Sequence, residues 1–190
     1  MTIVGFLLVT LAGYVLGSIP VAVLVGRRHR LDPRTVGDHN PGYWNMKQAV
    51  GRRAAMPVFI GDTLKGVAAA GVGRLAGGPW WLGYVTVGAA MVGHAWPIFA
   101  GFRGGRSILA FAGGVIVLAP IAAALAIAAL LVVTMITRSF AYGARVGVFG
   151  FPIVQAFLEA RAHVAGTGAL LCFIGLRFAL AARHEKRRSG

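Results

Sequence analysis

Residues 93–106 combine side chains and backbone that can bind an anion at a membrane surface. The stretch holds His94 and, at its end, two arginines that flank a pair of glycines. Guanidinium groups donate paired hydrogen bonds to phosphate, and glycine-rich backbone lets N–H groups approach an anion closely. His94 is either a packing residue or a group that positions donors or transfers a proton. The candidate anion ligands here are Arg103, Gly104, Gly105 and Arg106.

A carboxylate and an ammonium group lie inside an apolar segment, at Asp62 and Lys65. Ionisable groups at membrane depth are costly and mark functional sites or internal pairs. At a spacing of three residues on a helix, the two side chains share one face and can neutralise each other. The pair is therefore either structural, or Lys65 faces the anion while Asp62 orients it.

The long polar segment of residues 32–45 is predicted to be a structured loop rather than a helix, because Gly, Pro, Asn and Asp favour turns. It is either a capped, solvated interfacial loop or part of the anion site. Its asparagines supply amide donors, and its glycines allow a ligand near the backbone. The candidates are Asn40, Gly42 and Asn45.

Several chemistries are disfavoured by what the sequence lacks. It contains no Gly-x-Ser-x-Gly elbow, no P-loop, and no His-x-x-Glu-His or Cys-x-x-Cys metal motif. Five acidic residues offer little to a two-carboxylate hydrolase or a magnesium cage. We therefore expect phosphate-bearing substrates, with no metal and no cofactor.

The composition indicates a membrane protein of a single domain, residues 1–190. Hydrophobic residues make up 57% of the chain and charged residues 13%, with a mean hydropathy of +0.75. A soluble domain usually carries about 25% charged residues. The net charge of +14 is interpreted as positive-inside bias and attraction to anionic lipids or substrates, not as nucleic-acid binding.

Seven apolar segments are expected to cross the membrane: residues 3–25, 54–73, 80–100, 107–120, 121–136, 146–158 and 164–182. The fourth and fifth divide one long apolar stretch at Pro120, and the sixth is short for a full crossing. With the N-terminus outside, seven spans leave only Arg74 and Arg161 outside among the basic residues of the loops and tail. The predicted fold is an all-α integral membrane protein of about seven helices, with the N-terminus outside and the C-terminus in the cytoplasm.

Five short motifs occur in an order and spacing that resembles a known family. They are Gly17-Ser18-Ile19-Pro20, Asp32-Pro33-Arg34, Gly37-x-x-Asn40-Pro41-Gly42-x-x-Asn45, Gly61-Asp62-x-x-Lys65-Gly66 and Gly93-His94-x-x-Pro97-x-Phe99-x-Gly101-Phe102-Arg103-Gly104-Gly105. Together they are similar to the bacterial membrane glycerol-3-phosphate acyltransferases that use acyl phosphate. The resemblance runs from the first helix to about residue 115.

The resemblance implies transfer of an acyl group from acyl phosphate to the 1-hydroxyl of glycerol 3-phosphate in the bacterial cytoplasmic membrane. The products would be lysophosphatidic acid and phosphate, in phospholipid synthesis. The polar heads would meet at the inside surface, and the acyl chain would lie between helices. His94 and Asp62 are candidate catalytic residues; the departing phosphate could accept the hydroxyl proton. Partners are both substrates and membrane lipids, with the oligomeric state left open.

The sequence departs from the family pattern at several motif positions. The usual Gly-Ser-Gly-Asn-Pro-Gly-Ala-Thr-Asn has Asp38 and His39 in place of Ser-Gly, and Gly-Gly-Lys-Gly has Ser107 in place of its last glycine. Asp38 repels phosphate unless it is protonated or paired; His39 is a candidate partner, and both count as candidate catalytic residues. Arg183-His184-Glu185-Lys186 only loosely matches the family's Arg-His-x-Glu-Asn-Ile. Two alternatives stay open: an impaired relative that binds lipid phosphates or a partner and, more weakly, a small-molecule transporter.

Overall fold

The computed structural model describes the backbone of residues 1–188 and the side chains as far as Arg183. Within that part the chain is helical and contains no β-strand. The helices are α1 (Ile3–Gly17), α2 (Val21–Arg28), α3 (Tyr43–Val50), α4 (Arg52–Leu75), α5 (Leu82–Ala95), α6 (Ile108–Leu118), α7 (Pro120–Thr137), α8 (Phe140–Leu158) and α9 (Arg161–Arg188). A 3₁₀ turn, η1 (Ile98–Ala100), follows α5.

Six helical segments of the described chain are long and apolar enough to cross a membrane. They are α1 with α2, α4, α5 with η1, α7, α8, and α9 as far as Arg183. The apolar helix α6 has 11 residues, or about 16 Å, which is roughly half of a ~30 Å hydrocarbon core. These helices confirm the predicted all-α membrane protein of about seven spanning segments, some of them short.

The break at Pro120 lies where the sequence placed it. Ala119 leaves the helical region with φ −139°, and Pro120 occupies the first position of α7. Proline lacks an N–H and clashes with the preceding turn, so it ends one helix and starts the next.

Three predicted boundaries are corrected by the structure. The expected segment 146–158 is longer, because α8 begins at Phe140 and includes Arg145, whose guanidinium lies 5.4 Å from the ring centre of Tyr142. The expected span 3–25 is interrupted before Pro20, which opens α2. The polar segment 32–45 is a loop only as far as Gly42, where α3 begins.

Small residues allow two helix pairs to pack closely. A Cβ atom at Gly17 of α1 would overlap the carbonyl oxygen of Ala90 in α5. A Cβ atom at Gly113 of α6 would overlap the carbonyl oxygen of Thr63 in α4. The two contacts fix the backbones of α1, α4, α5 and α6 against one another.

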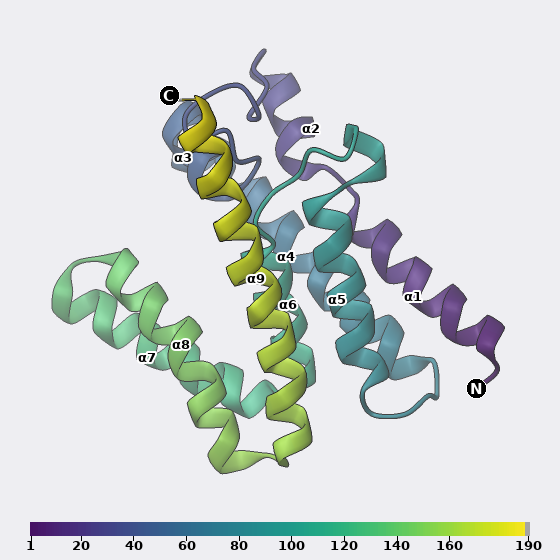
Figure 1. Ribbon diagram of the computed structural model, residues 1–190. Helices are drawn as coiled ribbons and strands as arrows, with labels where there is room; N and C mark the ends of the chain where they lie inside the picture. Colours follow the sequence, from purple (N-terminus) through teal and green to yellow (C-terminus); the bar gives the residue numbers. More distant parts are fainter. Residues whose placement is uncertain (189–190) are drawn as a thin grey trace.

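The helices form a bundle from which the α7–α8 hairpin projects sideways (Figure 1). The N-terminus lies at one end of the bundle, and α9 finishes at the other, where α2 and α3 also lie (Figure 1). The polar loops that contain the candidate site residues are found at this second end.

Candidate active site

A buried polar group lies between α4 and α5. Oδ1 of Asp62 is 2.9 Å from Nζ of Lys65 and 3.6 Å from Nδ1 of His94. The three residues are 2%, 5% and 8% exposed, respectively. Electrostatic attraction is stronger where water is excluded, so the Asp62 carboxylate orients both neighbours. The fold thus brings together residues from two separate sequence motifs.

Lys65 stabilises the break between α1 and α2. Its Nζ donates to the carbonyl oxygens of Gly17 at 3.1 Å and Ile19 at 3.0 Å, in addition to its pair with Asp62. These contacts use all three ammonium protons. In this structure Lys65 holds the backbone from which α2 begins, and its use as an anion ligand stays a prediction.

A cleft opens beside this group, and the first turn of α2 lies along it. Its lining includes residues 21–23, the three buried polar residues and Arg103, which is exposed at the rim. The first N–H groups of a helix lack helical acceptors and carry partial positive charge. The cleft therefore combines backbone donors with a guanidinium group, an arrangement that suits an anion.

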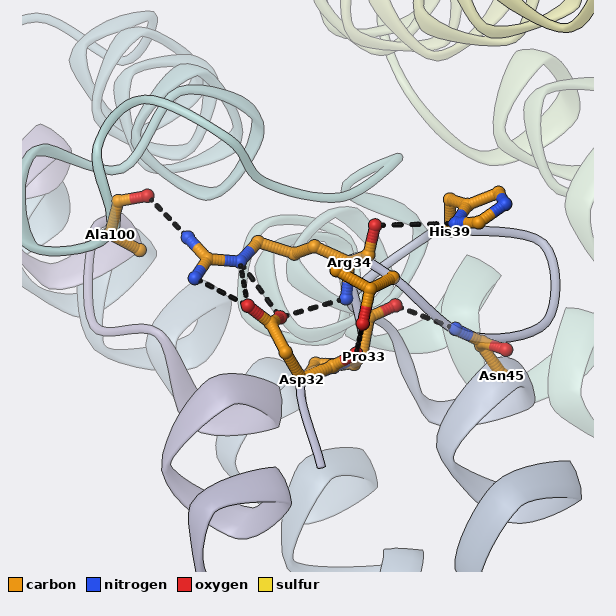
Figure 2. Close-up of polar contacts among 7 residues, drawn as sticks. Asp32, Pro33, Arg34, His39, Asn45 and Ala100 are labelled. Carbon is orange, nitrogen blue, oxygen red and sulfur yellow. Dashed lines mark hydrogen bonds and ion pairs between the residues drawn. The ribbon is translucent and has the colours of Figure 1, made fainter. Parts of the chain in front are cut away.

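Arg34 attaches the polar loop to the turn after α5. Its guanidinium bonds both carboxylate oxygens of Asp32, with a closest distance of 2.7 Å, and Nη1 donates to the carbonyl oxygen of Ala100 at 2.9 Å (Figure 2). The hydrogen bond from Arg34 is the main cause that lowers the pKa of the Asp32 carboxyl below its usual value. The bidentate pair with Asp32 fixes the guanidinium, and the hydrogen bond from Arg34 to Ala100 connects residues 66 positions apart in the chain.

The Asn45 side chain holds the polar loop through hydrogen bonds to its backbone. Its Nδ2 donates to the carbonyl oxygen of Pro33 at 2.9 Å (Figure 2). It also donates to the carbonyl oxygen of Val36 at 3.0 Å. Both amide protons are thereby used, and the side chain is buried. In this structure the backbone of its own loop takes both amide donors of Asn45, and donation from Asn45 to phosphate stays a prediction.

The glycine pair packs closely against the end of α5, and its N–H groups donate to the backbone there. The N–H of Gly104 donates to Ala95 at 3.1 Å, and that of Gly105 donates to His94 at 3.0 Å, in each case to the carbonyl oxygen. In this structure both N–H groups have backbone acceptors, and their use as phosphate donors stays a prediction. A Cβ atom on Gly105 would overlap the His94 ring, so glycine is required for the turn to lie against the histidine.

The Asp38 carboxylate pairs with Arg106, not with His39. Oδ2 of Asp38 lies 3.4 Å from Nη1 of Arg106, whereas Nδ1 of the exposed His39 lies 3.3 Å from the carbonyl oxygen of Arg34. The expected pair between Asp38 and His39 is wrong, because the chain turns the histidine back over its own loop. Arg106 is thus partly neutralised in this structure.

Asn40 and Gly42 lie near the end of the polar loop that precedes α3. The N–H of Asn40 donates to Oδ1 of Asp38 at 3.2 Å, and the N–H of Gly42 donates to the carbonyl oxygen of Asn40 at 2.8 Å. A Cβ atom on Gly42 would be 3.0 Å from Nδ2 of Asn40, and one on Gly105 would be 3.3 Å from its Oδ1. Gly42 therefore leaves room for an Asn40 side chain that reaches the glycine turn.

Sequence reasoning missed Arg177 on α9. Its guanidinium lies 4.7 Å from the ring centre of Trp96 and donates to the carbonyl oxygen of Gly105. The available signal was an arginine within an apolar segment, which membrane energetics mark as functional. The side chains of the loosely matching His184, Glu185 and Lys186 lie outside the described residues.

Comparison with known proteins identifies the family. The family model described as glycerol-3-phosphate acyltransferase matches residues 7–188. The chain belongs to the glycerol-3-phosphate acyltransferase family. The resemblance that the sequence motifs predicted is thereby confirmed and extends well beyond residue 115.

Two relatives that are named glycerol-3-phosphate acyltransferase illustrate this membership. The relative from Rubrobacter xylanophilus is 49% identical over 114 residues, which are 60% of this chain and 57% of that protein's length. The relative from Clostridioides difficile is 32% identical over 168 residues, or 85% of this chain and 82% of that protein. The first match thus spans little more than half of its relative, and the second most of it.

Two crystal structures of PlsY, an integral membrane glycerol 3-phosphate acyltransferase, share the fold. The glycerol 3-phosphate form has a TM-score of 0.81 at 22% identity, covering 96% of this chain and 92% of PlsY. The lysophosphatidic acid form has a TM-score of 0.78 at 23% identity, covering 90% and 87%.

Two departures from the family pattern occupy positions with positive φ. His39 has φ 55° and Ser107 has φ 64°, and both replace glycines of the usual motifs. Side chains other than glycine pay a steric penalty there. Ser107 is buried and offsets part of it, because its Oγ donates to the carbonyl oxygen of Met91 at 2.7 Å. The loop conformations that glycine favours are therefore retained without glycine.

Proposed function

We propose that this protein transfers an acyl group from an acyl phosphate to the 1-hydroxyl of glycerol 3-phosphate. The hydroxyl oxygen bonds to the acyl carbonyl carbon, and the bond from that carbon to the phosphate oxygen breaks. The products are lysophosphatidic acid and inorganic phosphate. The observation that carries the proposal is the cationic cleft over the buried Asp62, Lys65 and His94, in a chain of this family.

The headgroup phosphates bind at the rim and wall of the cleft. Arg103 supplies an exposed guanidinium, and the first turn of α2 supplies N–H groups. Asn40 and Arg106 approach from the loops on either side of the glycine turn. Charge-assisted hydrogen bonds of this kind stabilise the charge that builds on the departing phosphate.

His94 orients the reacting hydroxyl beside the departing phosphate. Its ring is held between Asp62 on one side and the glycine turn on the other, so it has little freedom to move. The phosphate carries its own negative charge and takes the hydroxyl proton. A neutral imidazole that is fixed in this way positions the reacting hydroxyl without serving as the obligatory base.

The acyl chain lies in an apolar groove between α6, α7 and α8. The groove is lined by Phe111, Ala112, Val115, Ile116, Ala123, Ala126, Ile127, Leu130, Gly147, Val148 and Phe151. Helix α6 begins directly after Arg106 and Ser107, so the groove starts about one turn from the headgroup site. This placement keeps the chain among apolar side chains while the polar heads meet in the cleft.

The cleft faces the cytoplasm in a bacterial cytoplasmic membrane. The loop cations of residues 27–34 and 103–106 belong to the end of the bundle opposite the N-terminus (Figure 1), and positive charge favours the cytoplasmic side. A reporter fused after Arg183 should be active only if it functions in the cytoplasm. Activity of a periplasmic reporter at that position would reverse the orientation.

The direct test supplies purified protein in detergent with acyl phosphate and glycerol 3-phosphate. We expect release of phosphate together with lysophosphatidic acid. His94→Gln should lose most activity, whereas His29→Gln should keep it, because His29 is exposed at the end of α2 and does not line the cleft. No product, under conditions in which an active family member turns over, would exclude the enzyme.

One observation favours a second candidate, a membrane protein that binds lipid phosphates without turnover. The Asp38 carboxylate occupies Arg106, a position that phosphate would otherwise contact. This candidate predicts binding of glycerol 3-phosphate without product, and activity that appears when Asp38→Ser and His39→Gly restore the family's usual residues. Wild-type turnover would eliminate it.

A further inference from the structure

Arg177 lies in α9, far along the chain from every motif of the site. Nη2 and Nε of its guanidinium lie 3.2 Å and 3.3 Å from the carbonyl oxygen of Gly105, and Nη2 lies 3.5 Å from that of Gly104. The guanidinium also stacks over Trp96, the residue that caps α5. One side chain of α9 therefore contacts both the end of α5 and the turn that follows it.

We propose that Arg177 is a positioning residue that holds the Gly104–Gly105 turn, and thereby the headgroup site, against α5. Its kinetic consequence rests on the proposed acyl transfer, whereas its effect on the turn does not. Arg177 is argued to act through the backbone and does not itself touch substrate.

The chemistry of the turn explains why an arginine is needed there. Glycines have no side chains, so the turn can be held only through its backbone groups. Its N–H groups already donate to the carbonyl oxygens of His94 and Ala95. The carbonyl oxygens on the other side of the turn require donors, and a planar guanidinium offers two on one edge. Arg177 thus completes the attachment of the turn on both sides.

The neighbouring residue of α9 extends the same contact. The ring centre of Phe178 lies 4.8 Å from the guanidinium carbon of Arg106, the residue directly after the glycine pair. Two consecutive residues of α9 therefore fix three consecutive residues of the loop. Repulsion between the two arginines is countered by Asp38, which pairs with Arg106.

The position of Arg177 within a spanning helix supports a specific role. Arg177 is partly buried. Removing a guanidinium from water among apolar helices is costly, and such residues generally face the protein interior and pair with carbonyl groups. A side chain that served only to pack α9 against α5 would work as well without its charge. The arginine therefore indicates that donation to the turn is what the position supplies.

The test measures hydrogen exchange at residues 101–107 together with kinetics, using full-length protein in detergent. In Arg177→Gln the amides of Gly104 and Gly105 should exchange about ten-fold faster, and the KM for glycerol 3-phosphate should rise about ten-fold with a smaller change in kcat. Arg177→Lys should behave like the Gln variant, because an ammonium group cannot donate two hydrogen bonds to the Gly105 carbonyl oxygen and stack on the Trp96 ring at the same time. Arg161→Gln, an exposed arginine in the first turn of α9, is the matched control and should leave both measurements unchanged.

Exogenous methylguanidinium should restore part of the exchange protection to Arg177→Ala. Normal exchange and kinetics in Arg177→Lys would overturn the proposal, as would a uniform loss of protection throughout the protein in Arg177→Gln. If the wild type does not turn over acyl phosphate, the proposed acyl transfer fails, and the exchange measurement still decides the role of Arg177. If Arg177→Gln does not fold, the Lys variant decides it.

Discussion

Replacement of Lys65 by methionine tests the buried ion pair between α4 and the α1–α2 junction. The substitution removes one ion pair of 2.9 Å and two hydrogen bonds to the carbonyl oxygens of Gly17 and Ile19. It leaves the Asp62 carboxylate buried without its ammonium partner, with the His94 ring at 3.6 Å as its remaining neighbour. Removing one partner of a buried pair typically costs about 3–5 kcal/mol.

The expected shift in melting temperature follows from that free energy. For a chain of this size, 1 kcal/mol corresponds to about 2–4 °C, so Lys65→Met should unfold about 6–20 °C below the wild type. Asp62→Asn should also be destabilising, because it leaves the ammonium group buried. The double variant removes both charges and should be more stable than Lys65→Met alone, with a coupling of about 2 kcal/mol.

The assay is scanning fluorimetry of the four purified proteins in one detergent. Lys65→Met within about 2 °C of the wild type would refute the structural role of the pair. A double variant whose shift equals the sum of the two single shifts would refute the coupling.

Three further predictions use the same thermal assay. Gly113→Ala should lower the melting temperature by forcing α6 away from α4, whereas Gly175→Ala, at an open helical position, should leave it equal or higher; equal losses would contradict close packing. Ser107→Ala should lower the free energy of unfolding by about 1 kcal/mol, because its hydrogen bond to Met91 is lost. Ser107→Gly should remain near the wild type, because glycine adopts the positive φ without steric penalty and this offsets the lost hydrogen bond. Equal destabilisation of the two variants would contradict the backbone argument. Arg34 lowers the pKa of Asp32 below 3.8, so above that pH the pair should stabilise the wild type relative to Asp32→Asn, by a small amount because Asp32 is partly exposed. The two melting temperatures should converge as the pH falls through the lowered pKa of Asp32. A difference in melting temperature that persists at low pH would contradict this direction.

Much of the fold could be predicted because membrane constraints act locally along the chain. Apolar runs of about 20 residues must be helical in a bilayer, since no water is present to satisfy the backbone. Pro120 divides the longest run because proline cannot continue a helix. The break before Pro20 was missed, because hydropathy alone does not report that Lys65 of another helix donates to the carbonyl oxygen of Ile19. The early start of α8 was missed, because hydropathy counts Arg145 as polar although its guanidinium lies over the ring of Tyr142.

By itself the sequence determined the membrane class, the approximate helices, the family, and Asp62, Lys65 and His94 as candidate site residues. Residue type and order are sufficient for these, because each depends on local patterns or on motifs read in sequence. Only the tertiary structure decided what each polar group does. Lys65, Asn45 and the N–H groups of Gly104 and Gly105 proved to be occupied by backbone partners. A hydrogen-bonding group can donate each proton only once, so its availability to a ligand depends on which carbonyl groups the fold has already brought within reach.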